Sequence, residues 1–100
     1  MSGPRAQESA RERVRRRLRI RGRVQGVAFR WSTCEAAEAA GVAGWVRNRP
    51  DGSVEAVLEG NPEVVARVEA FCRSGPPAAR VEAVEAVDET PEDLDGFEIR

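Results

Sequence analysis

The 100-residue sequence predicts an α/β sandwich of the α+β class, in which two helices cover one face of a mainly antiparallel sheet. Three observations predict this class: alternating apolar residues near the N-terminus, a hairpin pattern in the middle, and a helical pattern on each side of that hairpin. The order of elements is βαββαβ, followed by a further short strand. A chain of this length forms one domain with one core.

The first predicted strand follows a stretch without apolar periodicity. Residues 1–15 are small, polar or charged, and we expect them to form a flexible, arginine-rich tail. From Arg17 onward, Leu18 and Ile20 alternate with arginines, which suits a strand with one buried face. The folded domain is therefore predicted to span residues 16–100.

Two helices are predicted from their periodicity and their end signals. The first covers residues 29–40 and ends at Gly41, a suitable residue for a left-handed C-terminal position. Its apolar stripe is predicted to contain Ala36, Ala37 and Ala40. The second begins after Asn61, has Pro62 at its first position and ends at Gly75.

The remaining elements are strands. Residues 42–49 and 53–59 are separated by a Pro-Asp-Gly turn, which predicts a hairpin. The valines in residues 81–87 recur every three positions and fit a helix about as well as a strand, but their place in the topology favours a strand. Phe97 and Ile99 alternate in a short final strand.

Composition limits the chemistry that is available. The chain has no histidine, which removes the usual general base and the commonest metal ligand. Net charge is only −1, but ten arginines lie in residues 1–30 and eight acidic residues lie in residues 82–98. No stretch has the length of a membrane span and no apolar signal region is present, so we expect a cytoplasmic protein that does not bind membranes.

The two cysteines, Cys34 and Cys72, fall in separate predicted helices. If both helices pack on one face of the sheet, the thiols could approach one another. Disulfides are rare in cytosolic proteins, so buried free thiols are the favoured interpretation.

The loop before the first helix has the chemistry of a phosphoryl site. Glycines allow backbone amides to converge on one point, and the free N–H groups of the helix start point at that loop. An arginine in the first helical turn, Arg30, can then bind two phosphoryl oxygens at once. The predicted phosphate-binding residues are Gly22, Arg23, Val24, Gln25, Gly26, Val27 and Arg30. For Arg23 and Gln25 we expect the backbone to bind while the side chains face solvent.

These residues also carry a family resemblance. The run from Gly22 to Arg30, followed by Gly44-Trp45-Val46-Arg47-Asn48, resembles the two signature regions of acylphosphatases, over roughly residues 16–100. The resemblance implies a ferredoxin-like architecture and assigns catalytic roles to Arg30, which binds phosphate, and Asn48, which orients the attacking water. On local evidence alone, Asn48 would be an ordinary turn residue. The predicted topology places Arg30 and Asn48 near one another.

The resemblance implies hydrolysis of the carboxyl–phosphate bond of a small acyl phosphate, giving a carboxylate and inorganic phosphate. No metal, cofactor or covalent nucleophile is needed, and phosphate should act as product and inhibitor of a monomeric enzyme. The alternatives are a sensor that binds acyl phosphates without hydrolysis, and an anion- or nucleic-acid-binding module that uses the arginines between Arg11 and Arg23. Few aromatic residues and an acidic C-terminal third argue against nucleic acid. The identity of the acyl group is left open.

Overall fold

A computed structural model describes residues 12–100 of the chain. The predicted elements all occur in it, in the predicted order, and residues 81–87 lie within a strand. The elements are β1 (Val14–Arg23), α2 (Phe29–Ala40), β2 (Ala43–Asn48), β3 (Val54–Gly60), α3 (Pro62–Ser74), β4 (Arg80–Glu89) and β5 (Phe97–Ile99). In this part of the chain, neither helix has the length and apolar content that a transmembrane segment needs.

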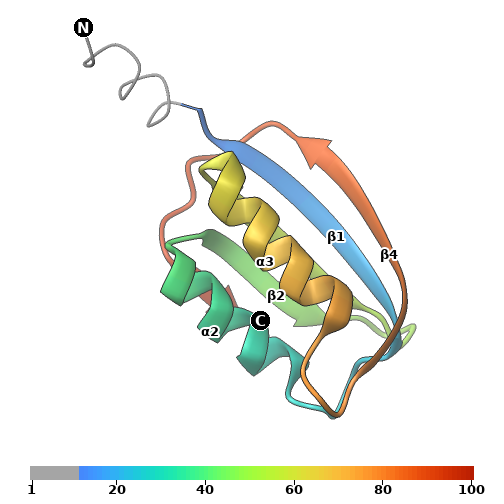
Figure 1. Cartoon of the computed structure of the whole chain (residues 1–100). Helices are drawn as coiled ribbons and strands as arrows, with labels where there is room; N and C mark the ends of the chain where they lie inside the picture. Colours follow the sequence, from blue (N-terminus) through green and yellow to red (C-terminus); the bar gives the residue numbers. More distant parts are fainter. Residues whose placement is uncertain (1–11) are drawn as a thin grey trace, which may run out of the picture.

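The strands form one sheet in the order β4-β1-β3-β2-β5. Neighbours are antiparallel except β2 and β5, which run parallel. Both helices pack on the same face of the sheet, and the C-terminus lies beside α2 (Figure 1). The predicted two-layer, mainly antiparallel fold is therefore confirmed, and the short final strand extends the sheet beside β2.

The first strand begins earlier than predicted. β1 starts at Val14 rather than Arg17, because Arg15 is buried and its Nη1 donates to Glu59 Oε2 of β3 at 2.7 Å. An ion pair between two strands that are distant in the sequence leaves no apolar periodicity. The alternation of apolar residues therefore could not indicate that the strand begins at Val14. The predicted flexible tail falls mostly on residues 1–11, which lie outside the described residues.

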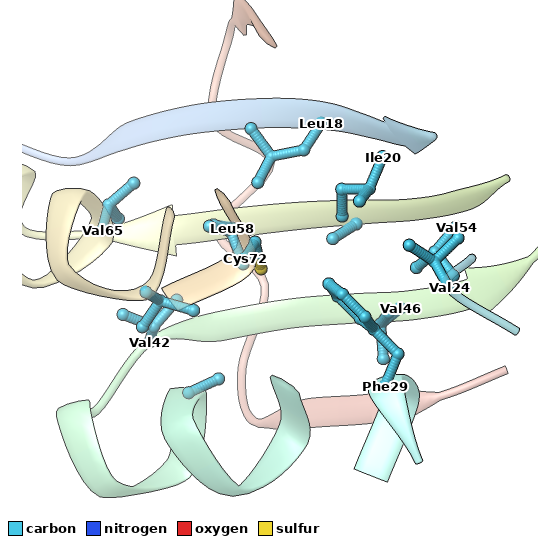
Figure 2. Close-up of a cluster of buried hydrophobic side chains, with 13 residues drawn as sticks. Leu18, Ile20, Val24, Phe29, Val42, Val46, Val54, Leu58, Val65 and Cys72 are labelled. Carbon is cyan, nitrogen blue, oxygen red and sulfur yellow. The ribbon is translucent and has the colours of Figure 1, made fainter. Parts of the chain in front are cut away.

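The core lies between the helices and the sheet. Leu18 and Ile20 of β1 and Val54 and Leu58 of β3 are fully buried there. Figure 2 shows Phe29, at the start of α2, reaching toward β2 and its Val46. Burial of each large apolar side chain stabilises the fold by about 1.5–3 kcal/mol. The β1–α2 connection is therefore fixed at its end by a core residue.

The buried stripe of α2 differs from the predicted one. It consists of Phe29, Thr33 and Ala37, which recur at intervals of four residues, whereas Ala36 and Ala40 are only half-buried. Ala37 is buried and Ala40 packs against the core, as predicted, whereas Ala36 is not among the core residues. The spacing of four from Phe29 is the signal that would have identified the buried stripe.

Both cysteines are free thiols, but only one is fully buried. Cys72 lies in the core with its Sγ 3.9 Å from Thr33 Oγ1, and burial raises its thiol pKa to about 12. Cys34 is only half-buried, so the expectation of two buried thiols was right for Cys72 alone. Desolvation, with help from Glu38, raises the pKa of the Cys34 thiol as well.

The sheet face opposite the helices carries arginines and carboxylates in register. Antiparallel pairing of β1 with β3 and β4 brings the arginine-rich N-terminal strand against acidic residues. Arg17 contacts both Glu55 of β3 and Glu89 of β4, and Arg21 Nε donates to Glu85 at 3.1 Å. The uneven charge distribution along the sequence is therefore neutralised within the fold.

Candidate active site

The loop between β1 and α2 presents a row of main-chain donors. Within residues 12–100, none of the backbone N–H groups of residues 24–31 donates a hydrogen bond to another group of the protein. The first N–H of α2 with such an acceptor is that of Ser32, which donates to the Ala28 carbonyl oxygen at 3.0 Å. No side chain caps the start of α2, and its first turn holds no acidic residue. A helix start in this state attracts an anion.

The backbone of the same loop adopts an uncommon conformation. Gly26 and Ala28 both have positive φ, 74° and 63°. Glycine adopts this conformation at no steric cost, but alanine pays about 1–2 kcal/mol for it. Val24 is buried and Val27 packs against the core, which anchors the loop through its side chains. Such a turn gathers N–H groups into a concavity that suits an anion.

Gly22 and Arg23 lie one step before this loop, at the end of β1. They pair with Val81 and Arg80 of β4 after a bulge at Arg21 and Gly22. A Cβ atom on Gly22 would lie 2.2 Å from the Arg80 carbonyl oxygen, so this position requires glycine. Gly22 therefore shapes the exit from the strand.

A pocket of about 220 Å³ opens at the loop and joins four segments of the chain. It is lined by Val24, Gly26, Ala28, Phe29, Arg30, Trp31, Asn48 and Ile99. The topology thus brings Arg30 and Asn48 to one pocket, as predicted. Gly22, Arg23, Gln25 and Val27, also predicted to bind phosphate, are not among the residues that line it.

Arg30 is held from the far side of the pocket by the end of β5. Its Nη1 donates to the Arg100 main-chain oxygen at 3.2 Å, and the Arg100 N–H donates to the Val46 carbonyl oxygen of β2 at 2.8 Å. The Arg100 guanidinium lies over the Trp45 ring, 4.8 Å from its centroid. One edge of the Arg30 guanidinium is therefore fixed, while its other N–H donors can still bind an anion in the pocket.

Gln25 ties the loop to the hairpin that carries Asn48. Its Nε2 donates to the Arg49 carbonyl oxygen at 2.8 Å and to the Ser53 carbonyl oxygen at 2.9 Å. The expectation that this side chain faces solvent was therefore wrong, because Gln25 crosses to the turn after β2. Asn48 is the last residue of β2, one position before Arg49. The Gln25 side-chain amide thus links the loop that carries the free N–H groups to the hairpin that carries Asn48.

A buried carboxylate fixes the same hairpin from the opposite sheet face. Glu55 accepts from Arg47 Nε at 2.7 Å and from Arg49 Nη1 at 2.8 Å, the two residues that flank Asn48. Burial alone would raise its pKa, but hydrogen bonds from Arg47, Arg17 and Arg49 outweigh burial and lower the pKa to about 2. Glu55 is therefore ionised at neutral pH and orders the strand around Asn48.

The sequence reasoning missed four pocket residues: Ala28, Phe29, Trp31 and Ile99. An alanine gives no signal for positive φ, so its backbone role was not predictable. Trp31 and Ile99 carried weak signals, since an apolar residue on the outer side of a helix start, or near the end of an edge strand, has no core to fill.

Comparison with known proteins identifies the family to which this chain is similar. The family model described as acylphosphatase matches residues 16–99. An acylphosphatase of Gloeobacter violaceus is 59% identical over 76 residues, which cover 76% of this chain and 82% of the relative. An acylphosphatase of Rubrobacter xylanophilus is 56% identical over 95 residues, 93% of this chain and 86% of the relative.

A solved structure of an acylphosphatase from Coxiella burnetii superposes with a TM-score of 0.87 at 31% identity, covering 93% of this chain and 98% of that one. The family model, the relatives and the solved structure all identify acylphosphatases. The family model covers residues 16–99, which include both the loop before α2 and Asn48. The chain belongs to the acylphosphatase family.

Proposed function

We propose that this protein hydrolyses acyl phosphates, with the phosphoryl group bound between the free N–H groups of residues 24–31 and the Arg30 guanidinium. The observation that carries this proposal is that row of main-chain donors without acceptors in the described residues. It runs through a loop whose Val24, Gly26 and Ala28 line one pocket with Arg30 and Asn48. The family and the names of its curated members support the same activity.

The chemistry follows from the charges in the pocket. Water attacks phosphorus, the bond between phosphorus and the carboxyl oxygen breaks, and its electron pair leaves with the carboxylate. Arg30 and the N–H groups stabilise the charge on the phosphoryl oxygens, while the Asn48 amide holds the water in line. An amide can donate to water and accept from it without changing its protonation. The water's proton passes to the carboxylate side of the substrate or to solvent, since the leaving group is already good.

Further properties belong to the proposal. The protein acts as a monomer in the cytoplasm, needs no metal, and is inhibited by its product phosphate. A cationic pocket and a sequence without histidine support independence from metal, because a metal would meet repulsion from Arg30 and lack its commonest ligand.

The test is a steady-state assay with acetyl phosphate as a small generic substrate. We expect turnover that persists in excess chelator and competitive inhibition by inorganic phosphate. Loss of activity in chelator, restored by a divalent metal, would contradict the metal-independent mechanism. Purely noncompetitive inhibition would count against a shared phosphate site, and binding of acetyl phosphate without turnover would indicate a sensor.

The nucleic-acid alternative is not favoured by the fold. Several arginines of its basic cluster form ion pairs within the described residues, including Arg15 with Glu59, Arg16 with Glu69 and Arg17 with Glu89. A phosphate backbone would have to displace these carboxylates before it could bind.

A further inference from the structure

Two of the most exposed large apolar side chains meet at the active-site pocket. Trp31 is 60% exposed and Ile99 is 46% exposed, and both line the pocket that holds Arg30 and Asn48. A third, Val87, is 53% exposed but lies on β4, away from this pocket. Exposed apolar surface beside a ligand pocket commonly belongs to the binding site.

Trp31 has no core to fill. It follows the buried Phe29 by two residues, and a step of two residues turns about 200° around a helix. Because Phe29 points into the core, Trp31 must point away from it. The tryptophan ring therefore buries little surface in the fold, and its position beside Arg30 is free to serve a ligand.

Ile99 reaches the pocket from β5. It pairs with the buried Val46 in the parallel β2–β5 ladder, so it lies on the sheet face that carries the helices. β5 contacts α2 directly, and the next residue, Arg100, holds the Arg30 guanidinium. Trp31 and Ile99 thus flank the phosphate-binding arginine from a helix and from a strand.

The pocket has a polar part and an apolar part. Arg30 and Asn48 supply polar side chains to its lining, whereas Trp31 and Ile99 supply exposed apolar ones. An acyl phosphate with an apolar acyl group has the same division, with a dianionic phosphoryl group at one end and a hydrocarbon at the other.

We propose that Trp31 and Ile99 form an acyl-binding rim, which selects acyl phosphates with aromatic or other bulky apolar acyl groups over those with small ones. This inference rests on the proposed function, since it assigns the acyl end of the same substrate. Aromatic surface contributes through stacking as well as burial, and the effect on discrimination is a few-fold to about tenfold.

The test compares benzoyl phosphate with acetyl phosphate in the full-length chain. We expect the parent to favour benzoyl phosphate in kcat/KM, and both Trp31→Ala and Ile99→Ala to lower that preference, Trp31→Ala by about three- to tenfold. Trp31→Phe should keep most of the preference, because it retains an aromatic face. Val87→Ala removes an equally exposed apolar side chain elsewhere and should leave the preference unchanged.

Equilibrium binding separates this inference from the proposed function. Phenylphosphonate and methylphosphonate share a phosphoryl-like end and differ in the apolar group, so calorimetric titration measures the rim without turnover. We expect tighter binding of phenylphosphonate and loss of that advantage in Trp31→Ala. If neither acyl phosphate is hydrolysed, the proposed function is wrong. The titration still tests whether Trp31 and Ile99 bind an apolar group beside the phosphoryl-like end. A parental preference in Trp31→Ala, or an equal loss in Val87→Ala, would overturn the inference.

Discussion

The side chain of Gln25 offers a direct test of how the site is held together. Gln25→Met keeps the length of the side chain but removes both hydrogen bonds to the turn after β2. Each such bond contributes about 0.5–1.5 kcal/mol net. The two acceptors keep other partners, since the Arg49 carbonyl oxygen accepts from Gly52 N–H at 3.1 Å and the Ser53 carbonyl oxygen from Arg49 N–H at 2.8 Å. The free energy of unfolding should therefore fall by about 1–3 kcal/mol.

Gln25→Met should lower kcat as well as the free energy of unfolding. Without Gln25, the hairpin can move relative to the loop, and a displacement of Asn48 by about 1 Å can cost up to 10² in rate. We expect kcat to fall by about tenfold or more while the inhibition constant of phosphate stays within a few-fold, because the N–H row and Arg30 are untouched. Steady-state assays with phosphate inhibition, alongside thermal unfolding, measure both quantities.

A matched control separates positioning from stability. Asn61→Ala removes the cap of α3, whose Oδ1 accepts from the Glu63 N–H at 2.9 Å, far from the pocket. It should cost about 1 kcal/mol of stability with kcat unchanged. If Gln25→Met kept the parental kcat despite a comparable loss of stability, the positioning role of Gln25 would be refuted.

Three other perturbations have expected outcomes. The folded-state pKa of Glu55 is lowered from 4.5 to about 2, so its contribution of about 3 kcal/mol should be present above pH 4.5 and lost as pH falls toward 2. Glu55→Gln should flatten that acid limb in pH-dependent denaturation, and an unchanged limb would contradict the assignment. A chain that begins at Glu12 should keep kcat and Tm, because β1 begins at Val14; a loss of kcat at constant Tm would show that residues 1–11 complete the site. Arg30→Lys should recover little kcat relative to Arg30→Ala, since a point charge cannot make two parallel bonds to phosphoryl oxygens; near-parental kcat would argue against a two-pronged contact.

The fold was predictable because local signals agreed with one another. Asn61 and Pro62 marked the start of α3, and Gly41 marked the end of α2. Alternation identified β1 and β5, the Pro-Asp-Gly turn identified the hairpin, and only its place in the topology identified β4. The start of β1 was not predictable from such signals. The first residues of β1 join the sheet where Arg15 pairs with Glu59, which lies 44 positions away in the sequence.

The site was predictable only in part. Arg30 and Asn48 were expected to approach, and they line one pocket. The contacts that orient them are long-range and leave no local pattern: Gln25 reaches a turn 24 residues away, and the oxygen that holds Arg30 comes from Arg100. The exposure of Trp31 likewise depends on which face of α2 the core selects.

The central claim is that phosphate binding and water positioning reside in different side chains. The most direct measurement is the inhibition constant of inorganic phosphate, determined together with kcat, for Arg30→Ala and Asn48→Ala. Asn48→Ala should bind phosphate within a few-fold of the parent while kcat falls by about 10² or more. Arg30→Ala should lose both phosphate affinity and turnover, with about 3 kcal/mol or more of transition-state stabilisation removed. Turnover of Asn48→Ala at the parental rate, or normal phosphate binding by Arg30→Ala, would contradict this division of roles.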